Sequence, residues 1–338
     1  MDTVSDNFRS RGHPCATLWF VRLSDNHVEV FLVELSWGRR YVMVRPDHFR
    51  VDYQINPFMD LSQQPDPALT REQWDGLVAA MRAAGAGVEV IEQRGDAPDM
   101  VYAMNLGFVV ERPEGPLVSS SAGHAVMSHM RYAERRMETS TAAAWFAGRG
   151  FSVSYVGREG IGAHLEAGDA FAWGDALVVG YGPRTDELGL KALATELSVR
   201  VRGLRITHPG MYHLDLAFCP LDDRRAIVCP SAFDEESAAA LLALVPEPLV
   251  ITEEEALTTF AANSIVVGST VLMPATADGS NARIVARLEE WGFTVAQLDL
   301  SQFHLGGGSI RCLTNPIDVR LGRDLPLLPS GEVVLPRQ

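Results

Sequence analysis

One pattern recurs along the chain: an amphipathic, helix-like segment is followed by a β-prone run. The helix-like segments are 71–87, 139–150, 184–198, 234–246 and 280–292, and the runs that follow them are 88–93, 151–156, 199–206, 247–252 and 293–300. Apolar residues at helical spacing predict each helix, and most of the helices stop at glycine or proline. Further short strand-like segments, such as "DALVVGYG" and "SIVVGSTVLMP", lie between them. The sequence therefore predicts a β-rich repeat with one helix per unit.

Two folds can accommodate such a repeat, whose period is roughly 50 to 65 residues. A doubly wound parallel sheet would usually carry a glycine-rich phosphate loop after its first strand, but here three glycines stand in the last repeat, at 306–308. We therefore favour an α/β fold of five ββαβ-type units around a pseudo-fivefold axis, which limits exposed sheet edges and gathers strand ends around a central site. Residues 1–40, with a hairpin pattern over 17–35, are expected to be an accessory segment, and 41–338 a single domain.

The composition narrows the classes of partner. Hydrophobic residues make up 47% and charged residues 21% of the 338 positions, and the formal net charge is −14. Nucleic acids and anionic membranes select for clustered Lys and Arg, so neither is an expected partner, and a small cationic substrate fits better. Arg22, Asp25 and Asn26 interrupt the only apolar stretch near the N-terminus, so we expect no signal peptide and a cytoplasmic protein. The oligomeric state is left open, with a homodimer as one option.

The cysteines are few and scattered. Cys15, Cys219, Cys229 and Cys312 show no CxxC spacing, so neither a structural zinc site nor a disulfide framework is expected. Cys312 differs from the others because it closely follows the three glycines, at the start of a β-prone run, where a thiol can face a cavity. A free cysteine more often packs in a core than reacts. Cys312 is therefore a candidate nucleophile only if a partner is found.

Two short segments supply candidate partners. "GMYHLDLAF" holds His213 and Asp215 two residues apart, so on a strand both would point to one face. The alternative is a histidine satisfied by backbone contacts inside a buried strand. "HLEAGDAFAW" holds Glu166 and Asp169 between apolar residues, where acids need a partner or a bound cation to offset desolvation. The alternative for these acids is a polar turn between strands.

Eight segments in order resemble the guanidino-group-modifying enzymes of the pentein superfamily, namely arginine deiminases, dimethylarginine dimethylaminohydrolases, amidinotransferases and arginine dihydrolases. The segments, from about Arg45 to about Pro316, are "VRPDHFRVDYQINPFM", "PDMVYAMNLGFVV", "MRYAERRME", "LEAGD", "VVGYGPRTD", "YHLDLAF", "ANSIVVGSTVLMP" and "GGGSIRCLT". The resemblance implies a five-bladed α/β propeller and makes residues 41–338 a catalytic domain. It also implies chemistry that needs no metal and no nucleotide cofactor.

The resemblance implies a role for each candidate in the catalytic group. Cys312 matches the nucleophile, His213 the general acid/base, and Glu166 the carboxylate that orients the histidine. Asp215 matches the acid that holds the guanidinium. Two small departures from the family pattern, Ala167 in place of a glycine and Leu216 in place of a threonine, put the local hydrogen bonding beside Glu166 and Asp215 in question.

Further positions are implied as substrate contacts. Asp99 is a further contact for the guanidine end, Asp169 is counted with the substrate-binding acids, and Arg131 and Arg184 match residues that bind the substrate's carboxylate. The alternative for the two arginines is a solvated surface charge. Six residues after Asp99, where deiminases and dimethylargininases carry aspartate, this chain has Asn105, as arginine dihydrolases do. The alternative for Asn105 is an ordinary turn residue.

Three functions follow from this interpretation. The first is hydrolysis of the guanidino group of arginine or an arginine-like compound, with the dihydrolase outcome (ornithine, ammonia and carbon dioxide) favoured by Asn105. The second is an amidinotransferase that passes the amidino group to an amine. The third, from another class, is a non-catalytic binding protein, because the same fold includes a ribosome-binding translation factor; retention of Cys312, His213 and Glu166 together argues against it.

Overall fold

The computed structural model describes residues 23–24, 27–28, 35, 37–111, 122–158, 160–174 and 176–321. The chain divides into two compact units, residues 1–32 and 33–338. In the first unit, β1 (Leu23–Ser24) and β2 (His27–Val28) pair antiparallel, as a hairpin requires. The other residues of the predicted hairpin up to position 34, and Cys15, lie outside the described residues. The predicted domain boundary at 40/41 stays a prediction.

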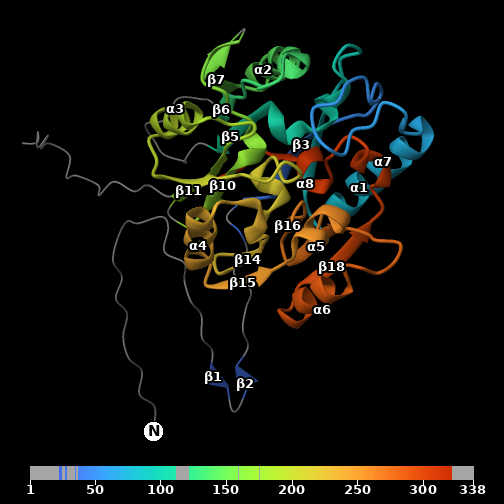
Figure 1. Cartoon of the computed structure of the whole chain (residues 1–338), viewed down its shortest axis with the longest axis vertical. Helices are drawn as coiled ribbons and strands as arrows, with labels where there is room; N and C mark the ends of the chain where they lie inside the picture. Colours follow the sequence, from blue (N-terminus) through green and yellow to red (C-terminus); the bar gives the residue numbers. More distant parts are fainter. Residues whose placement is uncertain are drawn as a thin grey trace, which may run out of the picture. The chain divides into compact units, whose positions relative to one another are not determined.

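In the described part of the second unit, five three-stranded sheets share one topology (Figure 1). The first two strands of each sheet are antiparallel, and a helix connects the second strand to the third, which lies parallel to it. This order confirms a mixed α/β fold with a β-rich repeat. Because the strands form several small mixed sheets, a single doubly wound parallel sheet is excluded for these residues.

The bounds of the five units, written as strand, strand, helix and strand, are as follows. The unit that joins the two ends of the domain is β19 (Asn315–Pro316), β3 (Arg40–Val44), α1 (Pro67–Ala83) and β4 (Gly87–Ile91). The next two are β5 (Gly107–Glu111), β6 (Gly123–Met127), α2 (Arg136–Gly148) and β7 (Phe151–Tyr155), and then β10 (Ala170–Trp173), β11 (Ala176–Tyr181), α3 (Glu187–Leu197) and β12 (Val201–Arg205). The last two are β13 (Phe218–Pro220), β14 (Arg225–Val228), α4 (Glu235–Leu244) and β15 (Glu247–Val250), and then β16 (Ile265–Val267), β17 (Thr270–Pro274), α6 (Ala282–Glu290) and β18 (Thr294–Leu298).

Shorter elements connect these units. They are the two-stranded ladder of β8 (Gly157–Arg158) and β9 (Ile161–Gly162), the helices α5 (Glu253–Thr259), α7 (Ser301–His304) and α8 (Ile310–Leu313), and the 3₁₀ turns η1 (Pro98–Val101), η2 (Ala103–Leu106), η3 (Ala133–Arg135), η4 (Ala167–Asp169), η5 (Leu214–Leu216) and η6 (Pro230–Ala232). The five predicted helix and strand pairs are all present, whereas α5 was not predicted. Its signal is the capping box of Thr252 and Glu255, which starts a helix too short to show an amphipathic repeat.

Helix α1 illustrates how the sequence sets these elements. The Asp66 carboxylate accepts the N–H groups of Ala68 and Leu69, and Pro67 stands at the first helical position, so the helix starts four residues earlier than its apolar pattern indicates. Its buried stripe, which includes Trp74 and Leu77, packs in a core cluster with strand and loop residues. None of the helices in the described residues is long and apolar enough to cross a membrane.

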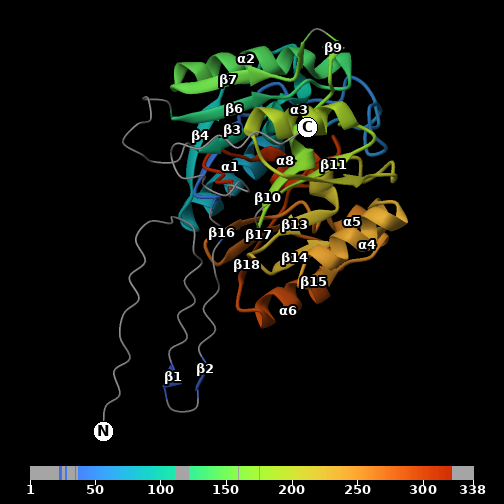
Figure 2. The ribbon, with the colours of Figure 1, turned by 90° about the vertical axis from the view of Figure 1, so that its left-hand side faces the viewer.

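The two ends of the domain meet at β19 and β3. The Asp318 carboxylate accepts the backbone N–H groups of Gly38, Arg39 and Arg40 at 3.0, 2.7 and 3.1 Å. The segment just after Cys312 is thereby fixed to the first strand of the domain. Figures 1 and 2 both show α8 in the interior of the domain, with α2 and α6 at opposite ends.

Candidate active site

Cys312 lies on the short helix α8, not at the start of a β-prone run as we expected. The physical reason is that the backbone donors of this segment bond within the turn and to Asn263. The N–H of Leu313 bonds to the Ser309 carbonyl at 3.0 Å, and that of Arg311 bonds to the Asn263 carbonyl at 3.0 Å. Because no neighbouring strand supplies these bonds, the segment forms one helical turn that packs against η2 and β17.

The glycines before Cys312 are required by packing. Gly307 has φ +87°, which disfavours any side chain, and a Cβ on Gly308 would lie 2.9 Å from the Cys312 Cβ. The Tyr212 hydroxyl donates to the Gly307 carbonyl at 2.6 Å, and the Tyr102 hydroxyl donates to the Phe303 carbonyl at 2.7 Å. These two tyrosines therefore hold the loop that leads to the thiol.

His213 and Asp215 are both buried, but His213 directly precedes the 3₁₀ turn η5 and Asp215 lies within that turn, so neither lies on a strand. The reason is that the Leu214 N–H is taken by the Asp169 carboxylate, with Oδ1 at 2.9 Å, while the Leu216 N–H closes a turn onto the His213 carbonyl at 3.1 Å. Asp169 thus holds the backbone between His213 and Asp215. The hydrogen bond of Asp169 to the Leu214 N–H is structural, and its predicted role as a substrate contact stays a prediction.

Glu166 brings three predicted residues together. Its Oε2 lies 2.8 Å from His213 Nε2 and accepts a hydrogen bond from Arg184 Nη1 at 3.1 Å, while its Oε1 accepts the backbone N–H of Arg131 at 2.9 Å. Burial by itself would raise the pKa of Glu166, but the Arg184 charge and the His213 contact outweigh burial and hold that pKa well below its usual range. An ionised Glu166 orients the imidazole and leaves Nδ1, which is buried without a hydrogen-bond partner among the described residues, available for chemistry.

The two predicted carboxylate-binding arginines differ from each other. Arg184 is buried, bonded to Glu166 and to the Ile55 carbonyl at 3.0 Å, and lies over the rings of Tyr132 and Tyr212. The side chain of Arg131 is exposed, and only its backbone reaches Glu166. In this structure Arg184 therefore holds Glu166, the carboxylate that bonds to His213. Of the two arginines, Arg131 is the one whose side chain matches the alternative of a solvated surface charge.

The Cys312 thiol is held by an asparagine and an aspartate. Its Sγ lies 3.5 Å from Asp215 Oδ2 and accepts a hydrogen bond from Asn263 Nδ2 at 3.2 Å. Burial, and next the negative charge of Asp215, raise the pKa of the Cys312 thiol well above its usual value. Both effects disfavour the thiolate in the free protein.

Three buried acids near His213 or Cys312 keep an oxygen atom without a donor. Asp99 Oδ1, Asp169 Oδ2 and Asp215 Oδ1 have no hydrogen-bond partner among the described residues. The Tyr53 hydroxyl lies beside Asp99 but outside hydrogen-bonding geometry, and burial raises the pKa of Asp99 to about 6 despite the nearby Arg135 charge. Burial likewise raises the pKa of Asp169 to about 7. Unpartnered carboxylate oxygens in a buried site favour a ligand rich in N–H donors.

Asn105 lies within this cluster and is buried. Its Oδ1 accepts the Gly168 N–H at 3.0 Å, and a Cβ added to Gly168 would lie 2.8 Å from that Oδ1 and 3.0 Å from Asp215 Oδ2. Asn105 and Asp215 therefore face the same glycine. With one lone pair of Oδ1 engaged, the other lone pair and the donor group Nδ2 are left for a ligand or a water.

Sequence reasoning missed Asn263 and the tyrosines Tyr102 and Tyr212. Asn263 carried a signal, because it is a lone polar residue before the apolar run "SIVVG" inside a segment already matched to the family. The described residues contain no group of three or more His, Cys, Asp or Glu side chains arranged to hold a metal ion.

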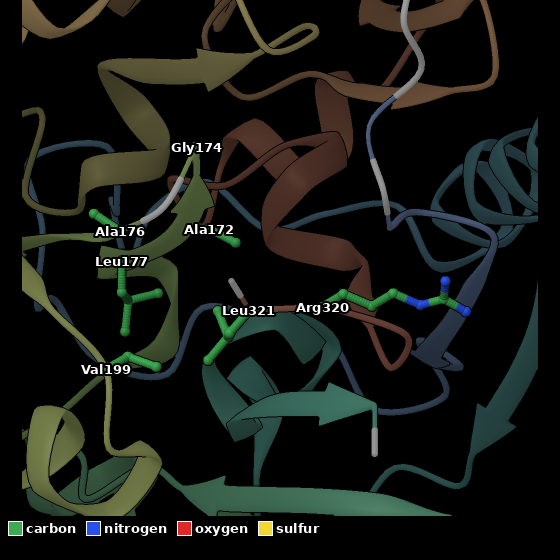
Figure 3. Close-up of a pocket in the computed structure, with 7 residues that line it drawn as sticks. All are labelled: Ala172, Gly174, Ala176, Leu177, Val199, Arg320 and Leu321. Carbon is green, nitrogen blue, oxygen red and sulfur yellow. The ribbon is translucent and has the colours of Figure 1, made fainter. Parts of the chain in front are cut away.

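A separate pocket lies near the β10–β11 turn (Figure 3). It is lined by Ala172, Gly174, Ala176, Leu177, Val199, Arg320 and Leu321. None of these residues is a member of the cluster around Cys312, so the pocket plays no part in the chemistry considered below.

A buried thiol, an imidazole and several carboxylates lie together on this mixed α/β fold, and solved enzymes that act on guanidino groups share the fold. The N-terminal domain of ArgZ, an arginine dihydrolase from the ornithine-ammonia cycle in cyanobacteria, has been solved bound to substrate; it is 29% identical with a TM-score of 0.74, covering 82% of this chain and 98% of that domain. A variant of that domain, covalently bound to a reaction intermediate, has the same TM-score of 0.74 and identity of 29%, over 85% of this chain and 99% of the domain.

Sequence comparison identifies the family. The model of the family described as "N,N dimethylarginine dimethylhydrolase, eukaryotic" matches residues 45–319. The N(G),N(G)-dimethylarginine dimethylaminohydrolase of Mycobacterium tuberculosis is 33% identical over 276 residues, which are 82% of this chain and 85% of that protein. The chain belongs to this dimethylarginine dimethylaminohydrolase family of guanidino-group-modifying enzymes.

Proposed function

We propose that this protein hydrolyses the guanidino group of arginine or an arginine-like compound, with Cys312 as nucleophile, and that the dihydrolase outcome is favoured. The observation that carries the proposal is a pair of buried carboxylates whose Oδ1 atoms lack donors: Asp99, and Asp215, whose Oδ2 lies 3.5 Å from the Cys312 thiol. A guanidinium supplies several N–H donors together with a positive charge. The unpartnered oxygen atoms can accept those donors.

The substrate charge also accounts for a thiol that is protonated in the free protein. A guanidinium held by Asp215 and Asp99 brings positive charge beside Cys312 and favours the thiolate. The thiolate attacks the central guanidine carbon, a C–S bond forms, a C–N bond breaks, and His213 delivers a proton to the departing nitrogen, which leaves as ammonia. Glu166, held ionised by Arg184, keeps the imidazole oriented for this transfer.

Release of the covalent intermediate uses water. His213 removes a proton from the water as it attacks the carbon bonded to sulfur, and cleavage of the C–S bond returns the Cys312 thiol. In the dihydrolase outcome a further water attacks the same carbon and its two remaining C–N bonds break, so that arginine and two waters give ornithine, two ammonia molecules and carbon dioxide. Asn105, with its donor group facing the site, would orient that water. The relatives named above support both the guanidino substrate and a covalent intermediate.

The finer form of the fold is part of this proposal. We propose that the five sheets are the blades of a five-bladed α/β propeller around a pseudo-fivefold axis, as the sequence pattern predicts. Five units of one ββαβ topology support it, as does the structural likeness to the ArgZ domain. Such an arrangement gathers the loops that carry Cys312, His213 and Glu166 at one centre.

Incubation of the purified protein with arginine and, separately, with dimethylarginine tests the proposal. Products are identified by mass spectrometry, with and without candidate amines. Ornithine from arginine supports the dihydrolase outcome, citrulline alone points to a deiminase, and product only after an amine is added points to an amidinotransferase. Absence of any product from all of these guanidines would contradict the proposal.

Asn105→Asp should change the product from mostly ornithine toward mostly citrulline. An aspartate would still accept the Gly168 N–H, but it replaces the donor group by a negative charge that favours the cationic guanidine and cannot donate to a water. The ratio of citrulline to ornithine is measured by mass spectrometry. Asn281→Asp, which changes another buried asparagine, is the control and should leave the ratio unchanged.

The acidic side of the pH profile should depend on Asp99. Its pKa is raised to about 6, so below that pH the carboxyl group is neutral and cannot balance a guanidinium, and kcat/KM for arginine should fall as pH decreases through about 6. Asp99→Asn should remove this decrease and lower kcat/KM at neutral pH by about 10- to 100-fold, the effect of losing a charged hydrogen-bond partner. If the wild-type protein and Asp99→Asn share the same acidic limb, Asp99 does not bind the substrate.

A further inference from the structure

The side-chain amide of Asn263 uses its full hydrogen-bonding capacity on the segment that carries Cys312 and on the backbone of Asp215. Its Oδ1 accepts the backbone N–H groups of Ser309 and Cys312, both at 3.1 Å. Its Nδ2 donates to the Asp215 carbonyl at 2.9 Å and to Cys312 Sγ at 3.2 Å. A carboxamide offers two donors and two acceptor lone pairs, so none is left for another role.

The backbone of Asn263 is fixed as tightly as its side chain. Its N–H bonds to the Phe260 carbonyl at 2.8 Å, and its carbonyl accepts the Arg311 N–H at 3.0 Å. Phe260 has φ 51°, a left-handed conformation that a bulky residue seldom adopts unless its surroundings enforce it. The side chain of Asn263 is fully buried. The loop between α5 and β16 is therefore shaped to present this amide to Cys312.

The electrostatics around Sγ give this contact a chemical consequence. A thiolate on Cys312 would be buried and would lie 3.5 Å from Asp215 Oδ2, a group that carries the same sign of charge. Among the described residues, Asn263 is the side chain that donates a hydrogen bond to Sγ. A hydrogen bond to an ionised acceptor is about twice as strong as one between neutral groups, so this donor favours the thiolate over the thiol.

We infer that Asn263 is a catalytic residue that stabilises the Cys312 thiolate through its Nδ2–H, while its Oδ1 positions the backbone of Ser309 and Cys312. The inference rests on the proposed function for the assignment of Cys312 as nucleophile. Asn263 would be a fourth catalytic residue beside Cys312, His213 and Glu166. It lies in a segment that resembles the family, but the resemblance assigned it no role.

Two variants test the donor role. Asn263→Leu removes the donor and the acceptor without adding charge, whereas Asn263→Asp keeps an oxygen to accept the N–H groups of Ser309 and Cys312, loses the donor and adds a negative charge beside Sγ. The matched control is Asn281, a buried asparagine whose Nδ2 donates to the Pro274 carbonyl and Gln297 Oε1, both at 3.0 Å, away from the thiol. Asn281→Leu and Asn281→Asp report the general cost of each change.

The measurement is the rate of alkylation of Cys312 by iodoacetamide as a function of pH, with peptide mapping to separate Cys312 from the other cysteines. The midpoint of the profile is the readout, because altered access to the thiol scales all rates equally and leaves the midpoint in place. Both Asn263 variants should move the midpoint upward by about 1 to 2 pH units, which is a 10- to 100-fold loss of thiolate at neutral pH. Both Asn281 variants should leave it unchanged.

The inference is wrong if the midpoint stays at the wild-type value in Asn263→Asp, or if the Asn281 variants move it equally. The shift in Asn263→Leu carries the inference because that variant adds no charge; if it does not fold, an unmoved midpoint in Asn263→Asp still rules out the donor role, because the lost donor and the added charge would both raise it. Alkylation needs no substrate, so the result decides the role of Asn263 even if no guanidine is turned over. Where a guanidine is turned over, the Asn263 variants should lose kcat in parallel with their thiolate content, while KM changes little. If a guanidine is turned over but the alkylation midpoint of the Asn263 variants stays unmoved, the inference about Asn263 is wrong and the proposed function still stands.

Discussion

Cys312→Ser should reduce turnover of arginine by about 10⁴-fold or more while the protein stays folded. A serine hydroxyl nearly matches the thiol in volume and can keep the contacts with Asn263 and Asp215, but it is far less acidic and does not become an anionic nucleophile here. Turnover is measured by product formation, and folding by the thermal unfolding midpoint. Turnover at a near wild-type rate would rule out the covalent mechanism.

The other described cysteines provide the controls for this experiment. Cys219 and Cys229 are free and buried, and burial raises the pKa of the Cys219 thiol to about 12 and that of the Cys229 thiol to about 11. Neither therefore forms a thiolate at neutral pH. Cys219→Ser and Cys229→Ser should retain activity close to that of the wild-type protein, so that a loss confined to Cys312→Ser assigns the chemistry to one sulfur.

His213→Ala should lower kcat by about 10²- to 10⁴-fold, the range typical of a lost general acid/base. The imidazole is held by Glu166 at 2.8 Å and has its Nδ1 free to exchange a proton with the departing nitrogen and then with water. Glu166→Gln should have a smaller effect, because the amide can still bond to the ring but no longer stabilises its protonated form. Steady-state kinetics with arginine, together with unfolding midpoints, measure both effects.

His124→Ala is the matched control for His213→Ala. His124 lies on β6, where its ring nitrogens contact Ser152, Ser154 and Glu196, and it has no contact with the Cys312 cluster. Its loss should leave kcat unchanged. Equal and small losses from His213→Ala and His124→Ala would mean that His213 has a structural role only.

The sequence predicted the repeat well because its signals are local. Helical spacing and glycine or proline ends are read within one segment, and all five helix and strand pairs were found this way. The membership of the cluster could also be predicted, since Cys312, His213, Glu166 and Asp215 each match a family segment. Helix α5 was not predicted because it is too short to show an amphipathic repeat, although its capping box at Thr252 marks the start of a helix.

The contacts inside the cluster could not be predicted, because they join residues distant in the sequence through particular side-chain conformations. Asn263 reaches Cys312 across 49 residues, and Arg184 reaches the Ile55 carbonyl across 129. The expected strand at His213 failed for the same reason, since the Asp169 carboxylate takes the Leu214 N–H from 45 residues away. Local propensity gives way where a distant side chain supplies the hydrogen bond.

The most direct test of the central claim is intact-mass spectrometry of the protein quenched during turnover of arginine. The account predicts an adduct with the mass of arginine less ammonia, located by peptide mapping on Cys312 and absent from Cys312→Ser. Turnover of arginine with no adduct on Cys312 at any quench time in either the wild-type protein or His213→Ala, or an adduct on a different residue, would contradict it.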